Sequence, residues 1–167
     1  VREMNLKLLR PATKLSIESH IVSVKSIQNG AVSSRDWAPL HTDQSWAKGE
    51  GKLPNIIMNN YTLNGLIIKY ITNIYGHASR VGKVNFKIKK PICPGDCLEF
   101  HGVVIQKIKI DKHRSWVEIA LLIKTNEGTS ASAKIYVAVN ETETLIASPW
   151  KLSSSEWSSS LKLCQNY

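Results

Sequence analysis

The longest apolar stretch of this 167-residue chain reads NIIMNNYTLNGLIIKYITNIY and spans residues 55–75. Its apolar side chains fall on nearly every side of a helix, and such a helix is normally buried on all sides. Gly76 is a suitable helix stop, and Gly65 within the helix predicts a close approach by another backbone. Polar residues that include Asn59, Asn60, Asn64 and Lys69 interrupt the stretch, so it does not predict a membrane span of about 20 apolar residues.

Four later segments alternate apolar and polar residues with a period of two. They cover residues 83–89, 98–110, 116–123 and 131–139. Turn sequences separate them, of which Pro94-Gly95-Asp96 is the clearest. Alternation over this length predicts an antiparallel meander with one buried face.

The regions before the long helix and after the meander give weaker patterns. The run Ile17–Ile27 is strand-like, and residues 44–48 predict a short helix capped by Thr42 or Asp43. Residues 1–148 are expected to form one domain. The Ser-rich residues 149–167 predict a tail that is partly disordered or packed on a partner.

We expect one strand, one long helix and four antiparallel strands. A sheet curled around the helix best buries the apolar faces of all these elements. This is the α+β hot-dog architecture, in which the helix is wrapped and each strand buries one face. An exposed edge strand in such a sheet invites edge-to-edge pairing. We therefore expect a homodimer or a higher oligomer of dimers.

Composition limits the function classes. The net charge is +9, with 43% hydrophobic and 21% charged residues. No nucleic-acid motif accompanies the lysines, so a phosphate-bearing small molecule is a better expectation than nucleic acid, and no membrane contact is expected. The three cysteines have neither zinc spacing nor a disulfide framework. With no visible secretory signal, these features predict a cytoplasmic protein without a metal.

The chemistry is expected at Asp36-Trp37-Ala38-Pro39-Leu40-His41. A carboxylate and an imidazole stand five residues apart around a proline turn, and both can transfer protons near neutral pH. Placed on one turn, the pair could hold a single water between them, as adding water to an activated double bond requires. The alternative is a helix-capping aspartate beside a turn histidine.

These residues resemble the MaoC-like hot-dog family of hydratases and dehydratases, which includes the (R)-specific enoyl-CoA hydratases. The resemblance covers roughly residues 14–140 and centres on Asp36–Asp43. A second match is Pro91–Phe100, which is similar to the family's entrance to its third strand. The chain departs from the family where the helix begins, because Ile57-Met58-Asn59-Asn60 stands in place of the usual His-Gly.

The resemblance implies roles for particular residues. Asp36 and His41 would activate water, and Asn59 or Asn60 would support the thioester oxygen at the start of the helix. The remaining substrate-binding residues are predicted to be Gly65 together with Arg80, Lys83 and Lys87, whose charges suit coenzyme A phosphates. The substrate would be an acyl thioester of coenzyme A or of acyl carrier protein, with no further cofactor.

Two other functions stay open. A thioesterase on this fold usually needs a carboxylate on the central helix, and residues 55–75 contain no Asp or Glu. A non-catalytic or partner-dependent subunit that binds acyl-CoA would suit the missing His-Gly. The resemblance also implies a possible hetero-oligomer with a second hot-dog chain.

Overall fold

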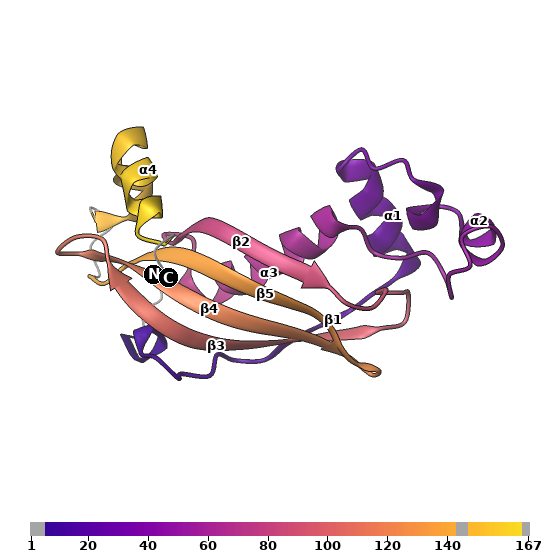
Figure 1. Ribbon diagram of the computed structural model, residues 1–167, viewed down its shortest axis with the longest axis horizontal. Coiled ribbons are helices and arrows are strands. Elements are labelled where there is room, and N and C mark those ends of the chain that lie inside the picture. The colour runs from indigo at the N-terminus through magenta and orange to yellow at the C-terminus, as the bar shows by residue number, and fades with distance from the viewer. Residues whose placement is uncertain (1–5, 143–146, 165–167) are drawn as a thin grey trace.

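A computed structural model describes residues 6–142 and 147–164. Five antiparallel strands form one sheet in the order β1-β3-β4-β5-β2, and helix α3 lies along one face of it (Figure 1). The strands are β1 (Glu18–Ile21), β2 (Arg80–Ile88), β3 (Cys97–Lys109), β4 (Arg114–Thr125) and β5 (Gly128–Asn140). The helices are α1 (Val24–Ser33), α2 (Gln44–Lys48), α3 (Asn60–Tyr75) and α4 (Ser154–Lys162), with 3-10 turns at Leu6–Leu9, Pro39–His41 and Pro149–Lys151.

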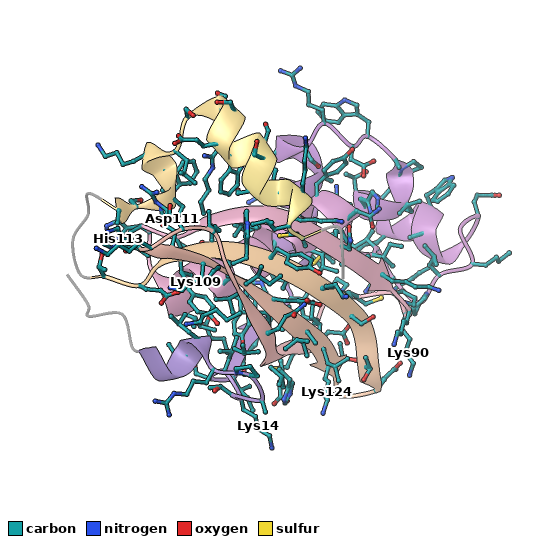
Figure 2. All side chains as sticks on the ribbon, turned by 60° about the vertical axis from the view of Figure 1, so that its left-hand side comes forward. Lys14, Lys90, Lys109, Asp111, His113 and Lys124 are labelled. Carbon is teal, nitrogen blue, oxygen red and sulfur yellow. The ribbon has the colours of Figure 1, made fainter. Side chains whose placement is uncertain are left out.

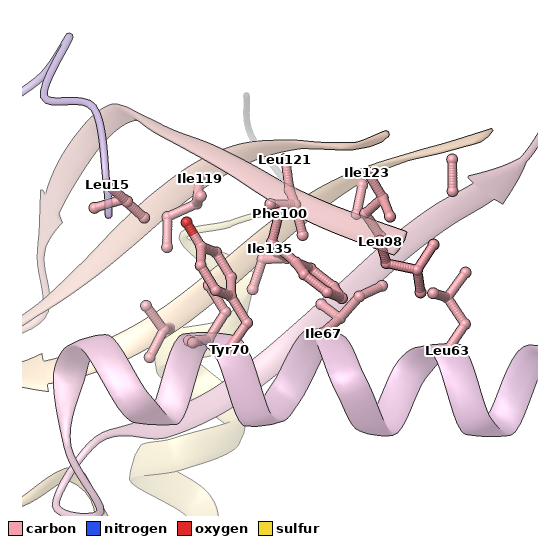
Figure 3. Packing of buried hydrophobic residues seen from close by; sticks show 14 of the residues in the cluster. Leu15, Leu63, Ile67, Tyr70, Leu98, Phe100, Ile119, Leu121, Ile123 and Ile135 are labelled. Carbon is pink, nitrogen blue, oxygen red and sulfur yellow. The ribbon is translucent and has the colours of Figure 1, made fainter. Parts of the chain in front are cut away.

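The core lies between α3 and the inner face of the sheet. Leu63, Ile67 and Tyr70 point from α3 toward the sheet (Figure 3). They meet the inward side chains of β3, β4 and β5, among them Phe100, whose ring stacks on Tyr70 at 5.4 Å. The predicted hot-dog arrangement and its four-stranded meander are therefore confirmed.

The helix differs from its prediction in length and in burial. It begins at Asn60 because Asn59 caps it by accepting a hydrogen bond from the Thr62 backbone, and residues 55–59 are not helical. The prediction that the helix is buried on all sides is wrong for the single chain, since Tyr61 is 67% exposed and Ile68 is 37% exposed. No atom lies within 4 Å of a side chain built on Gly65, so the expected close backbone approach there is also wrong within one chain.

The predicted strand over residues 17–27 is mostly wrong. Only Glu18–Ile21 is a strand, and α1 follows directly. Ser23 and Ser26 form a reciprocal capping box that starts this helix. Its buried residues are Ile27 and Ala31, which are four positions apart, and this spacing suits a helix.

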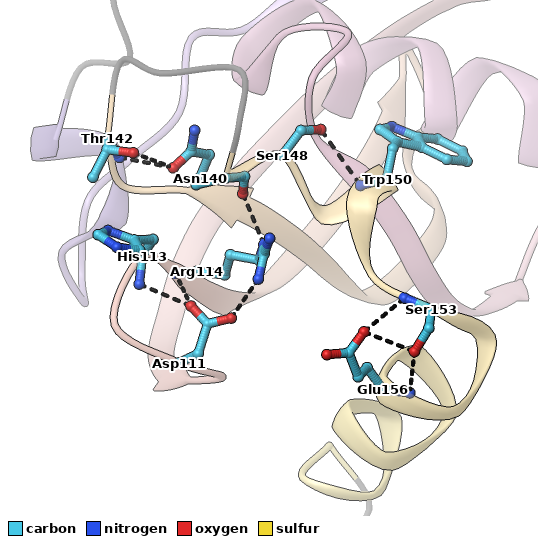
Figure 4. Close-up of polar contacts among 10 residues, drawn as sticks. Asp111, His113, Arg114, Asn140, Thr142, Ser148, Trp150, Ser153 and Glu156 are labelled. Carbon is cyan, nitrogen blue, oxygen red and sulfur yellow. Dashed lines mark hydrogen bonds and ion pairs between the residues drawn. The ribbon is translucent and has the colours of Figure 1, made fainter.

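The C-terminal segment packs on its own chain, so the prediction of a disordered or partner-bound tail is wrong for residues 149–164, and residues 165–167 lie outside the described residues. Helix α4 starts with a Ser153–Glu156 capping box (Figure 4). Trp157 and Leu161 pack against Trp116 and Tyr136 on the outer face of the sheet, where Cys164 is also buried. This second cluster lies at the end of the molecule away from α1 and α2 (Figure 1).

Candidate active site

Asp36 and His41 meet where α1, a 3-10 turn and α3 come together. After α1 ends, Arg35 adopts a left-handed conformation with φ of 56°. The chain then turns back, and the Asp36 N–H donates to the Ala31 carbonyl at 2.9 Å. The proline turn Pro39–His41 follows. It brings His41 Nε2 to 3.2 Å from Asp36 Oδ2, with the two side chains 10% and 25% exposed.

The partner of the second ring nitrogen fixes the protonation of His41. Nδ1 lies 2.7 Å from the Ile57 carbonyl oxygen, which can only accept a hydrogen bond, so Nδ1 carries a proton. A neutral imidazole would then present an unprotonated Nε2 to the Asp36 carboxylate. At 3.2 Å the Nε2–Oδ2 contact is within ion-pair distance for a protonated imidazole. The pair therefore places a carboxylate and an imidazole, two groups that can transfer protons, side by side.

The direct contact modifies the expected water geometry. A water placed in line between Asp36 and His41 would separate their polar atoms by roughly twice a hydrogen-bond length, and they are 3.2 Å apart. The expectation of a water in line between them is therefore wrong for this structure. A water touching both groups has to sit beside the contact.

The start of α3 supplies the other polar groups of the site. The first N–H groups of a helix have no partner within the helix. Asn59 accepts from Thr62 through its side chain and from Leu63 through its backbone. Within residues 6–142 and 147–164, no acceptor contacts the backbone N–H groups of Asn60 and Tyr61. These two donors sit at the positive end of a 16-residue helix.

A pocket of about 300 Å³ joins these groups. Asp36 and His41 lie on its wall with Asn59 and Asn60, beside Tyr61 at the start of α3. The rest of its lining is apolar and comes from Ile57, Met58, Ile88, Pro91 and Ile92. An acid–base pair therefore faces an apolar chamber that opens next to free helix N–H groups.

The remaining predicted site residues lie elsewhere. Gly65 is exposed on α3 and does not line the pocket. Arg80 stacks on two tryptophans of the C-terminal segment, 3.7 Å from the Trp157 ring centroid and 4.8 Å from that of Trp150. Lys83 is paired with Tyr136 across the sheet, beside the same outer cluster. Lys87 also lies on the outer face, four residue pairs further along β2. Its phosphate contact, like that of Arg80 and Lys83, remains an untested prediction.

Several lysines lie far from one another. Lys14, Lys90, Lys109 and Lys124 project from separate parts of the molecule (Figure 2). In the described ranges, no group of three or more His, Cys, Asp or Glu side chains could hold a metal ion. The described helices also include none that is long and apolar enough to cross a membrane.

Asp43 caps α2, and this gives a stability prediction. Its carboxylate accepts from the backbone N–H groups of Ser45 at 2.8 Å and Trp46 at 3.0 Å. Asp43→Ala should lower the free energy of unfolding by about 1 kcal/mol, since a capping oxygen is lost. Asp43→Asn keeps such an oxygen and should stay close to wild type. Urea titrations of both variants test this, and equal losses in both would contradict the capping role.

Two contributors to the site were not predicted from sequence. Ser34 and Thr62 both hydrogen-bond to Asn59, Ser34 from 25 residues away. The order Asn59-x-x-Thr62 before an apolar helical run is an N-cap pattern, so it could have indicated Thr62. Nothing local in the sequence indicates Ser34, because its contact depends on how α1 packs on α3.

The comparisons with known proteins agree with this geometry. A family model described as "MaoC like domain" matches residues 10–126. A comparison with curated protein sequences finds no match.

Solved structures of other proteins share the fold at low sequence identity. The R-hydratase PhaJ1 from Pseudomonas aeruginosa has a TM-score of 0.68 and 19% identity, covering 84% of this chain and 93% of its own. The (R)-hydratase from A. caviae gives 0.67 and 21%, covering 77% and 96%. The ChsH1-ChsH2 complex from Mycobacterium tuberculosis gives 0.70 and 18%, covering 78% and 98%.

The family model spans most of the chain and includes Asp36, His41 and the start of α3. The long central helix, the strands β1 to β4 and the Asp36–His41 contact all lie within this matched region. The chain belongs to the MaoC-like dehydratase family.

Proposed function

We propose that this protein adds water to a 2-enoyl thioester, or removes it from a 3-hydroxyacyl thioester, with Asp36 and His41 as the catalytic residues. The observation that carries the proposal is the contact between them on the wall of a largely apolar pocket. A group that gives a proton and a group that takes one are both needed for this reaction. The two hydratases among the structural neighbours share the fold in which such a pair would work.

The proton balance of the reaction follows from the pair. In the hydration direction, the oxygen of water attacks C3 of the enoyl thioester and Asp36 takes the proton that the water loses. C2 receives the proton held on Nε2 of His41. The proton on Asp36 then returns to Nε2 across the 3.2 Å contact, so the pair ends as it began. Dehydration runs through the same transfers in reverse.

The thioester oxygen becomes enolate-like while C3 is attacked. The backbone N–H groups of Asn60 and Tyr61 border the pocket at the positive end of α3. Donors fixed at such a position stabilise developing negative charge, each by roughly 3 kcal/mol. They take the part that the usual His-Gly opening would have played in the family.

The carrier is coenzyme A or acyl carrier protein, and the assembly is a dimer of hot-dog chains. Support for the dimer comes from β2, which is an edge strand of the sheet, and from the exposed apolar residues Tyr61 and Ile68 on α3. A partner-dependent subunit is the second candidate. It is favoured by one observation, that a structural neighbour is itself a complex of two chains, ChsH1 and ChsH2.

A panel of enoyl-CoA thioesters of increasing acyl length tests the function. We expect the enoyl absorbance to fall while the thioester bond survives, with free thiol measured in parallel. Release of thiol without loss of the enoyl group would identify a thioesterase. Activity that appears only after a second hot-dog chain is added would identify the partner-dependent subunit.

A further inference from the structure

Asn59 makes four hydrogen bonds through one side-chain amide and is only 3% exposed. Its Oδ1 accepts from the Thr62 backbone N–H at 2.9 Å and from the Thr62 hydroxyl at 2.6 Å. Its Nδ2 donates to Ser34 Oγ at 2.9 Å and to Asp36 Oδ2 at 3.1 Å. The amide therefore uses its oxygen and both of its N–H protons within the protein.

The partners allow only one orientation of this amide. A backbone N–H can only donate, so Oδ1 has to face Thr62. The Ser34 hydroxyl gives its proton to the Gly30 carbonyl at 2.8 Å, so Ser34 Oγ is an acceptor toward Asn59. A carboxylate oxygen of Asp36 is an acceptor as well. A flipped amide would set a donor against the Thr62 N–H and an oxygen against two acceptors.

The side-chain amide of Asn59 therefore has no proton left to donate to a substrate. An amide nitrogen has two protons, and Ser34 and Asp36 take them. The earlier expectation that the Asn59 side chain supports the thioester oxygen therefore does not suit this geometry. Asn59 touches the proposed chemistry only through the carboxylate of Asp36.

Gly30 makes the approach of α1 to α3 possible. A Cβ atom added at Gly30 would lie 1.9 Å from the Thr62 hydroxyl oxygen, so only glycine allows the two helices to come this close. This approach sets the end of α1, with Ser34 and then Asp36, beside the amide of Asn59. The packing of two helices thus fixes the position of a carboxylate that follows the first of them.

Asp36 has few other anchors. Its Oδ2 contacts Asn59 and His41, and within residues 6–142 and 147–164 its Oδ1 accepts only one long hydrogen bond, of 3.4 Å, from the Ala38 N–H. Without the Asn59 donor, the carboxylate could rotate and lose its alignment with His41. We propose that Asn59 is a positioning residue, locked by Thr62 and Ser34, that aims the Asp36 carboxylate at His41. This inference rests on the proposed function and names what orients its base.

Asn59→Ser is the sharpest test, because it separates helix capping from positioning. Serine keeps a capping oxygen for the Thr62 N–H, yet it has no donor that reaches Asp36. We expect kcat on an enoyl-CoA substrate to fall about 10- to 100-fold, while KM changes by less than about threefold, since Asn59 does not touch substrate.

Asn73→Ser is the matched control, since it makes the same substitution further along α3, where the amide donates to Glu18 at the surface. It should have wild-type kcat. Gly30→Ala should cause a loss of kcat similar to that of Asn59→Ser, because its methyl group displaces the Thr62 hydroxyl. An Asn59→Ser enzyme with wild-type kcat overturns the positioning role.

A readout without catalysis separates this inference from the proposed function. The side-chain NH₂ signals of Asn59, assigned by their loss in Asn59→Ser, should shift in Asp36→Asn and in Ser34→Ala in a ¹H–¹⁵N spectrum. If these shifts occur and every enoyl thioester is left unchanged, the positioning geometry stands and the hydratase function fails. If the wild-type enzyme is active and the Asn59 NH₂ signals do not shift in Asp36→Asn, the positioning role is wrong while the proposed hydratase function stands.

Discussion

Asp36→Asn and His41→Ala should each lower kcat/KM on an enoyl thioester by about 10³-fold, within the range for losing a general acid or base. Asparagine cannot take the proton of the attacking water, and alanine cannot hold the proton delivered to C2. Both changes break the 3.2 Å contact between the carboxylate and the imidazole. Because the two residues act as one unit, the double variant should be within a few-fold of either single variant.

Asp43→Asn is the matched control for these substitutions. It changes a nearby carboxylate to the same amide, and its role in capping α2 survives. Its kcat/KM should stay within about threefold of wild type, and circular dichroism should show that all four proteins are folded. If the fold-loss of kcat/KM in the double variant equals the product of the two single-variant losses, Asp36 and His41 act in separate steps.

The largest effect on stability is expected at Trp116, in the cluster under α4. Its side chain is fully buried, and its indole N–H donates to the Ser160 carbonyl at 3.0 Å. Gly82 leaves room for the ring, since a Cβ there would lie 2.4 Å from it. Trp116→Ala should lower the free energy of unfolding by about 3–5 kcal/mol through the cavity and the lost burial.

Trp150→Ala is the comparison for this prediction. Trp150 belongs to the same C-terminal segment and is 59% exposed. Its indole donates to the Ser79 carbonyl, so a loss of about 1 kcal/mol is expected. Urea unfolding followed by circular dichroism measures both. Equal midpoints for the two variants would mean that α4 does not hold this cluster in solution.

The sheet was predictable from sequence because its signal is local. Each strand from β2 to β5 alternates along its own length, and the turns between them contain residues such as Gly95 and Gly128, both with positive φ. Helix α1 was missed because Val22, Val24 and Ile27 also suit an extended chain. The Ser23–Ser26 capping box was the signal that would have decided for a helix.

The structure of the C-terminal segment, in contrast to the sheet, could not be predicted from local sequence patterns. Its serines suggest disorder, but Ser153 caps α4 and Ser160 accepts from Trp116. Arg80 was assigned to phosphate binding on its charge alone, and the structure places it against Trp150 and Trp157. The contacts of Trp116 and Arg80 with this segment join residues at least 44 positions apart, so charge and composition could not reveal them.

Part of the candidate site was likewise predictable from local sequence, and part of it depends on packing between distant segments. Asp36 and His41 were found because they share one turn, and the start of the long helix was found by its apolar run. The role of Asn59 toward Asp36 was not found, since it depends on α1 packing on α3 at Gly30. Sequence indicated which groups do the chemistry, and the packing of the two helices decides how they are aimed.

Turnover of an enoyl-CoA thioester in ¹⁸O-labelled water, with the products identified by mass spectrometry, tests the central claim most directly. Hydration by the Asp36–His41 pair predicts one ¹⁸O atom in the 3-hydroxyl group of an intact thioester, and no labelled product with Asp36→Asn. Label in a free carboxylic acid, or a labelled 3-hydroxyacyl thioester formed at the wild-type rate by Asp36→Asn, would contradict it.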